Sequence, residues 1–173
     1  LGTMLRTADA VGAGGVILVD DCVDPFSVEA VRASMGALFT QRIAKASWGE
    51  FLAWLRSGPG QLVGTSLDTD RDYQAVRYEA PTFIVAGNES QGLPPDYEAA
   101  CDVTVKIPML GKADSLNVAV ATAVMAGAIA TAAARPISTL WFVCLMHTSS
   151  EASVVHRVPA TTVVSTRNEP MSP

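Results

Sequence analysis

Three short stretches of this chain carry polar side chains whose types and spacing suit chemistry. They are residues 1–12, 84–93 and 106–123. Each sets a few polar residues into a glycine-containing bend beside an apolar run, and together they supply one arginine, one glutamate and two asparagines. Glycine bends let backbone amides approach a ligand closely, while a few polar side chains fix its orientation. The inventory therefore predicts a pocket for a small polar ligand.

The elements that must position these stretches alternate along the chain. Short apolar runs predict buried strands at residues 15–20, 61–65, 81–86 and 102–107. Helices are predicted after Ser27 and over residues 48–56, 92–100 and 115–134. Alternating strands and helices favour an α/β fold, a parallel sheet with helices on both faces.

Helix boundaries have their own signals. Ser27 is an N-cap candidate, and Ala30, Val31, Met35 and Leu38 share one face of the helix predicted after it. The helix predicted over residues 48–56 also has a cap signal. Ser47 and Glu50, three residues later, have the spacing of a capping box. A Gly-Pro-Gly sequence then ends that helix, and a Pro-Pro pair opens the short helix within residues 92–100.

The polar stretches fall at one edge of the predicted sheet. Ligands of parallel sheets bind beyond the carboxyl ends of the strands. Residues 86–92 follow one predicted strand, residues 108–114 follow another, and Thr65 ends a third. This placement depends on the element pattern alone.

Composition limits the class of protein. The 173 residues are 49% apolar and 17% charged, which suits one globular domain. Three widely separated cysteines show no metal-ligand or disulfide spacing, and they predict reduced thiols in a cytoplasmic protein. No basic segment followed by an apolar run opens the chain, so no secretory signal is expected.

The apolar, alanine-rich residues 118–134 raise the question of a membrane span. Thr122, Gly127 and Thr131 dilute the run, and Arg135 ends it near the lower length limit for a span. A helix buried in a core or a subunit interface is the favoured interpretation.

Taken in order, the three stretches resemble the motifs of the SpoU/TrmH family of RNA 2′-O-ribose methyltransferases, in the SPOUT class. The residues that carry the likeness are Arg-Thr-Ala at 6–8, Gly-Asn-Glu-x-x-Gly at 87–92, Ile-Pro-Met at 107–109 and Ser-Leu-Asn-Val at 115–118. The resemblance implies a C-terminal trefoil knot, S-adenosylmethionine as methyl donor, ribose of tRNA or rRNA as acceptor, and a homodimer. It implies no metal and no membrane.

The resemblance also assigns a cofactor site. The residues it implies are Thr65, Gly87, Asn88, Ile107, Met109 and Leu116. Gly87 lets the backbone approach the ligand, while Ile107 and Leu116 offer apolar contact and backbone groups to an adenine. Taken singly, each of these residues also suits an ordinary turn or core position.

The catalytic residues implied are Arg6, Glu89, Ser115 and Asn117. A guanidinium holds its proton too tightly to act as an ordinary base. Arg6 is therefore expected to bind the target phosphate and stabilise a developing alkoxide. The alternatives are a surface charge beside Asp9 for Arg6, loop organisation for Glu89 and an N-cap for Ser115.

The net charge of −5 is unusual for an RNA-binding protein, since phosphate contacts need basic side chains. An RNA surface must then be a local basic patch, or lie on a partner or another segment. The candidate phosphate contacts are Lys45, Arg71, Arg77 and Lys112. Each of them is also consistent with a solvated surface charge.

The ends of the chain depart from the family pattern. An asparagine and a strand that normally precede Leu1 are absent, and the likeness stops near Arg135. We therefore expect a methyltransferase domain over residues 1–135 and an unassigned tail over residues 136–173, in which residues 137–146 form a strand or a short buried helix. Two rivals stay open: a non-catalytic module that binds S-adenosylmethionine or a nucleoside, and a truncated chain that only dimerises.

Overall fold

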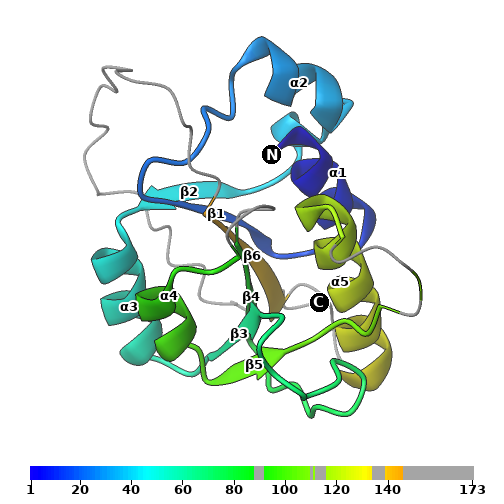
Figure 1. Cartoon of the computed structure of the whole chain (residues 1–173). Helices are drawn as coiled ribbons and strands as arrows, with labels where there is room; N and C mark the ends of the chain where they lie inside the picture. Colours follow the sequence, from blue (N-terminus) through cyan, green and yellow to red (C-terminus); the bar gives the residue numbers. More distant parts are fainter. Residues whose placement is uncertain (88–91, 110, 112–115, 134–138, 146–173) are drawn as a thin grey trace, which may run out of the picture.

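A parallel sheet forms the centre of the molecule. The computed structural model describes residues 1–87, 92–109, 111, 116–133 and 139–145. Within these residues, six strands form one sheet in the order β2-β1-β6-β4-β3-β5, and every neighbouring pair is parallel (Figure 1). The strands are β1 (Gly15–Val19), β2 (Ile43–Ala46), β3 (Gln61–Thr65), β4 (Thr82–Ala86), β5 (Val103–Val105) and β6 (Leu140–Cys144).

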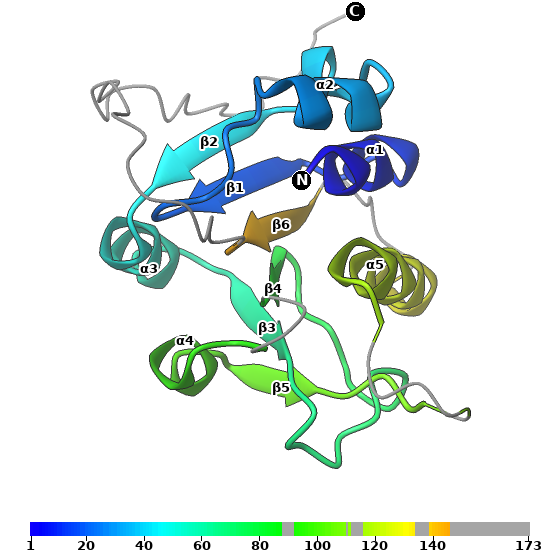
Figure 2. The ribbon, with the colours of Figure 1, turned by 45° about the horizontal axis from the view of Figure 1, so that its top comes forward.

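Helices cover both faces of the sheet, so the predicted α/β architecture is confirmed. The described helices are α1 (Gly2–Ala10), α2 (Val28–Ser34), the 3-10 turn η1 (Ala37–Phe39), α3 (Trp48–Arg56), α4 (Pro95–Ala99) and α5 (Val118–Ala133). Figure 2 shows α1 and α5 on one face and α3 and α4 on the other, while α2 packs on α1. None of the described helices is long and apolar enough to span a membrane.

The strands are apolar because both of their faces are buried. Along β1, Val16 and Leu18 join the core cluster beneath α1 and α5, whereas Ile17 and Val19 join the cluster beneath α3 and α4. A strand covered on both sides has a continuous apolar run rather than an alternating one. This explains why the strands could be predicted from such runs.

The central strand comes from late in the chain. β6 pairs with β1 on one side and with β4 on the other. For residues 137–146 the sequence left open a strand or a short buried helix, and the structure shows a strand over residues 140–144. Without β6 the described sheet would divide into β2-β1 and β4-β3-β5, so these five residues join its two halves.

The predicted caps of the early helices are confirmed. The Ser27 hydroxyl accepts a hydrogen bond from the Ala30 amide at 3.2 Å at the start of α2. Ser47 and Glu50 form a complete capping box at the start of α3. Such reciprocal bonds satisfy amides that have no partner within the helix, which is why their sequence pattern predicts a helix start.

Other expectations were wrong in detail. Met35 is 75% exposed rather than on a buried helix face, because α2 ends at Ser34 and Met35 adopts a left-handed conformation with φ 51°. The helix α1 and the strand β2 were not predicted. The last helix begins at Val118 rather than at position 115. The predicted C-terminal trefoil knot lies in part outside the described residues, which do not include 112–115, 134–138 and 146–173.

Candidate active site

The predicted cofactor residues follow the carboxyl ends of three adjacent strands. Thr65 is the last residue of β3, Gly87 comes directly after β4, and Ile107 lies two residues beyond β5. β3 lies between β4 and β5, and all three strands are parallel. Their carboxyl ends therefore meet at one edge of the sheet, where ligands of parallel α/β proteins bind.

Gly87 is the most constrained position at this edge. It is buried, and a Cβ atom built on it would lie 2.2 Å from the Gly92 carbonyl oxygen and 2.6 Å from the Leu93 amide nitrogen. The chain thus returns against its own backbone after residues 88–91. Gly92 itself has φ +68°, a conformation that side chains disfavour. The backbone therefore requires glycine at both positions of the second motif, at Gly87 because of the close approach and at Gly92 because of its φ. The sequence alone suggested this only for Gly87.

A neighbouring loop fixes the chain as it leaves β5. The Lys106 amide donates to the Arg71 carbonyl at 2.8 Å, and the Lys106 carbonyl accepts from the Tyr73 amide at 3.1 Å. Ile107 is then directed onto the core cluster shared with Val118 at the start of α5. The turn beyond β3 thus orients the third motif.

The start of α5 gives Asn117 a structural role. Its side-chain oxygen accepts a hydrogen bond from the Ala119 amide at 2.9 Å, and its carbonyl accepts from the Ala121 amide at 2.9 Å. These bonds place Asn117, and not Ser115, in the capping position of the described helix. Asn117 is exposed and Leu116 is half-buried, so both residues are accessible where the helix begins.

Arg6 lies on the exposed side of α1. It makes no hydrogen bond or ion pair with the described residues, and Asp9 instead accepts hydrogen bonds from Thr40 at 2.7 Å and from Gln41 at 3.3 Å. The exposed position of Arg6 is therefore consistent with the stated alternative, a surface charge on the helix that also carries Asp9. The helix that carries Arg6 packs against α5 on the same face of the sheet as Ile107.

Three predicted site residues, Asn88, Glu89 and Ser115, lie outside the described residues. Met109 is described and half-buried, two residues beyond Ile107. The structure thus brings Thr65, Gly87, Ile107 and Met109 to one edge of the sheet. Arg6 lies on α1, and Leu116 and Asn117 directly precede α5, which covers the same face of the sheet as α1.

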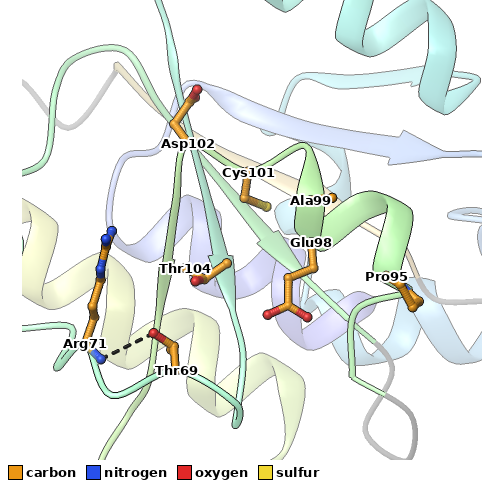
Figure 3. A pocket seen from close by; sticks show the side chains of 8 residues that line it. All are labelled: Thr69, Arg71, Pro95, Glu98, Ala99, Cys101, Asp102 and Thr104. Carbon is orange, nitrogen blue, oxygen red and sulfur yellow. Dashed lines mark hydrogen bonds between the residues drawn. The ribbon is translucent and has the colours of Figure 1, made fainter.

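A cavity of about 540 Å³ lies elsewhere, beside β5. Figure 3 shows it between α4, β5 and the loop around Thr69 and Arg71. Its lining residues are Thr69, Arg71, Pro95, Glu98, Ala99, Cys101, Asp102 and Thr104. None of the described residues predicted to bind the cofactor lines it, so the strand-end geometry, rather than this hollow, defines the candidate site.

The sequence analysis did not identify Asp20. This residue lies at the carboxyl edge of the sheet and links α3 to α4, the helices on the face opposite α1 and α5. Asp20 follows β1 with φ 54°, and its carboxylate accepts hydrogen bonds from the Trp48 amide at 2.9 Å and from the Tyr97 hydroxyl. The Trp48 and Tyr97 rings stack with centroids 4.2 Å apart. Burial, followed by the hydrogen bond to Asp20, raises the pKa of Tyr97 to about 12, so this hydroxyl stays protonated at neutral pH.

The Asp20 contacts have a positioning role. They join the carboxyl end of β1 to the first residue of α3 and to Tyr97 within α4. The helix α4 follows soon after the second motif. No motif in the sequence signals this role. A carboxylate just after a strand, followed by a second acidic residue, is indistinguishable from an ordinary polar loop.

The geometry defines a parallel α/β domain whose candidate site lies at the carboxyl edge of three adjacent strands. Comparison with known proteins gives its family. The model of the SpoU rRNA Methylase family matches residues 1–127, and the chain belongs to this family. The predicted resemblance to SpoU/TrmH proteins is therefore confirmed.

The relatives are consistent with this assignment. The chain is 38% identical over 136 residues to the 23S rRNA (uridine(2479)-2'-O)-methyltransferase of Streptomyces viridochromogenes, covering 75% of this chain and 47% of that protein. It is 32% identical over 125 residues to the 23S rRNA (guanosine(2553)-2'-O)-methyltransferase RlmP of Bacillus subtilis, covering 72% and 50%. The chain thus spans about half the length of these relatives.

Solved structures share the fold. The AdoMet-bound rRNA methyltransferase from Sinorhizobium meliloti superposes with a TM-score of 0.72 at 42% identity, covering 76% of this chain and 51% of that one. The SpoU methyltransferase AviRb from Streptomyces viridochromogenes, in complex with AdoMet, gives a TM-score of 0.69 at 36% identity, with coverage of 75% and 52%.

Proposed function

We propose that this chain is the catalytic domain of an RNA 2′-O-methyltransferase, which transfers a methyl group from S-adenosylmethionine to a ribose hydroxyl of rRNA or tRNA. The observation that carries the proposal is the convergence of two of its family motifs, through Gly87 and Ile107, on one edge of the sheet. The names of the relatives, which are 23S rRNA 2'-O-methyltransferases, favour rRNA.

The residues at this edge suit the proposed methyl donor. A side chain at Gly87 would collide with the returning backbone, so main-chain groups rather than side chains border the site there. Ile107, Met109 and Leu116 are half-buried, which provides apolar surface for an adenine without closing the site. When bound, S-adenosylmethionine supplies an electrophilic methyl carbon. The residues that would hold it are Thr65, Gly87, Asn88, Ile107, Met109 and Leu116.

The remaining chemistry falls to groups that hold the RNA and manage its hydroxyl proton. The Arg6 side chain is exposed and makes no hydrogen bond or ion pair with the described residues. It is therefore available to bind a phosphate and to stabilise negative charge on the ribose oxygen, while the hydroxyl proton leaves to phosphate or water. Asn117 holds the start of α5, whose first amides are further donors for an anionic group. Alignment of the reacting groups supplies much of the remaining acceleration. Glu89 and Ser115 complete the proposed catalytic set.

We further propose that the domain forms a homodimer through α5. Val120 is 47% exposed, and Ala123, Gly127 and Thr131 continue the same exposed stripe along the helix. An unpartnered face of small apolar residues allows two helices to approach closely. In such a dimer, Arg6 of one subunit acts on ligand bound by the other. Sedimentation analysis of Val120→Arg should show monomers where the unaltered chain is dimeric, and a monomeric unaltered chain would refute the dimer.

The C-terminal trefoil knot and a cytoplasmic location belong to the same proposal. Family membership supports the knot. The odd number and wide separation of the three cysteines support a cytoplasmic location.

Calorimetric titration with S-adenosylmethionine tests the proposed function first. We expect saturable binding by the purified chain and its loss in Leu116→Arg, which places a charge among the half-buried cofactor residues. A Phe39→Arg variant, which adds the same charge to an 81% exposed side chain of η1, is the matched control and should bind normally. A folded chain that binds no S-adenosylmethionine, or one that binds it but methylates no RNA from a total RNA pool, would contradict the enzymatic assignment for this domain.

A further inference from the structure

Two cysteine thiols meet at the carboxyl edge of the central strands. The Cys22 thiol donates to the Cys144 sulfur, with the two Sγ atoms 3.4 Å apart. Cys144 ends β6 and is 0% exposed, whereas Cys22 is half-buried in the loop that follows β1. The two residues are 122 positions apart in the sequence, so only the parallel pairing of β1 with β6 brings them together.

We propose that Cys22 and Cys144 are a redox modification site, which forms a reversible disulfide between the loop after β1 and the end of β6. Because a disulfide bond is about 2.05 Å long, the sulfur atoms need to approach by little more than about 1 Å. The β pairing of Cys144 with Leu18 and Ala86 holds it on both sides. Cys22 lies outside the described strands, so it is the partner that has to move.

The reaction balances with a small-molecule disulfide such as oxidised glutathione as the oxidant. The more accessible Cys22, as thiolate, attacks that disulfide, forms a mixed disulfide and releases one thiol of the small molecule. Cys144 then loses its proton and displaces the second thiol from Cys22. The net change oxidises two protein thiols to one disulfide and reduces the small-molecule disulfide to two thiols.

The third cysteine is an internal control. Cys101 packs on the other face of the sheet, with Tyr97 and the aromatic cluster, and its thiol donates to the Tyr97 carbonyl at 3.3 Å. Burial raises the pKa of Cys101 to about 12, so its reactive thiolate is scarce at neutral pH. Oxidation is therefore expected to leave Cys101 reduced.

The disulfide has a structural consequence at β6. This strand joins the two halves of the sheet, yet it lies beyond residues 1–127, which match the family model. A bond from Cys144 to the loop after β1 fastens the strand into the sheet. Oxidation thus strengthens the one central strand that does not come from the matched region.

The experiment treats the full chain with oxidised glutathione, blocks the remaining thiols and maps the products by mass spectrometry. We expect a mass loss of two hydrogen atoms, a link between the peptides that contain Cys22 and Cys144, and full reversal by dithiothreitol. Hydrogen exchange of the β6 amides should slow by about tenfold in the oxidised form. Cys101→Ser should behave identically, whereas Cys22→Ser should lose both effects.

Several results would overturn the proposal. They are retention of all three thiols under conditions that oxidise dithiothreitol, a glutathione adduct that stays on Cys22, a link through Cys101, and unchanged β6 exchange after oxidation. The unaltered chain carries the peptide map, so the result does not depend on whether a variant of the buried Cys144 folds.

Discussion

The face of the sheet beneath α3 and α4 is packed with aromatic rings, whereas the face beneath α1 and α5 is packed mainly with aliphatic side chains. On the aromatic face, Phe83 lies within 6.4 Å, between ring centroids, of Phe51, Trp54 and Trp141. The aliphatic face carries Arg6 and Ile107. Directional contacts therefore hold one face in place, while the other presents most of the candidate site.

Polar contacts reinforce this difference. Asp102 accepts hydrogen bonds from the Leu62 amide at 2.7 Å and from Arg56 at 2.9 Å, and so ties α3 to the start of the β3–β5 pair. Asp20 ties the same helix to α4. The aromatic face acts as the frame that positions the strand ends. Four substitutions test this division, ordered by their expected effect on the free energy of unfolding.

Removing the ring of Phe83 should have the largest effect. Phe83→Ala is expected to lower the free energy of unfolding by about 4 kcal/mol, because it creates a buried cavity and removes three ring contacts. Denaturant unfolding measures this. The matched comparison is Phe83→Leu against Phe142→Leu on the aliphatic face. Phe83→Leu should lower the free energy of unfolding by about 1 kcal/mol more than Phe142→Leu. Equal losses of stability would contradict the proposed difference between the aromatic and aliphatic faces.

A side chain at Gly87 should come next. Gly87→Ala is expected to destabilise the fold by about 2–3 kcal/mol and to abolish S-adenosylmethionine binding, because the new methyl group meets the Gly92 backbone. Calorimetric titration and unfolding curves report both effects. Gly49→Ala is the control, since a Cβ there meets nothing within 4 Å. Normal binding by a folded Gly87→Ala protein would place the cofactor elsewhere.

The Tyr97 hydroxyl gives a smaller effect with a pH signature. Its pKa rises from 10.0 to about 12 on folding, so the unfolded tyrosine ionises first and stability falls as the pH rises from 10 toward 12. Tyr97→Phe should cost about 1 kcal/mol at neutral pH and lessen this alkaline decline. The remaining decline is expected from Tyr78 and Cys101, since burial also raises their pKa values to about 12.

Unfolding curves at increasing pH check this expectation. Tyr73→Phe serves as the control, because the Tyr73 hydroxyl accepts a hydrogen bond from the exposed Gln74 side chain at 2.9 Å and not, like Tyr97, one made to a carboxylate. An alkaline decline that persists unchanged in Tyr97→Phe would assign the effect to another group.

Arg6 should have the smallest effect on stability and a large one on turnover. Arg6→Ala is expected to change the free energy of unfolding by less than about 0.5 kcal/mol, since the side chain is exposed and makes no hydrogen bond or ion pair with the described residues. Methyl transfer should fall by about 100-fold. Arg6→Lys keeps the charge but loses the planar fork, and full turnover with unchanged RNA affinity in this variant would exclude a role for that fork.

Much of the frame was predictable because its signals are local. The strands were found from continuous apolar runs, and α3 from its capping box. The helix α1 was missed because its start at Leu1 has no side-chain cap. The strand β2 was missed because it is short and only half-buried at the edge of the sheet. Met35 was misplaced because a left-handed residue, which the sequence does not signal, ends α2 early.

The candidate site divides in the same way. The sequence identified Thr65, Gly87 and Ile107, because a parallel sheet places the residues after its strands at one edge. It did not identify Asp20, whose contacts to Trp48 and Tyr97 join distant segments. It also gave Asn117 no capping role, because the start of α5 is set by packing as well as by cap chemistry.

The sequence by itself determined the α/β class and the family, and it predicted the edge of the sheet where the candidate site lies, since periodicity, caps and motif spacing are written along the chain. Only the tertiary structure decided that residues 140–144 form the central strand and that Cys22 meets Cys144. An apolar run of that length suits a strand or a buried helix equally well. Its form is decided by the unpaired strand edges of β1 and β4, whose backbone groups need hydrogen-bond partners inside the core.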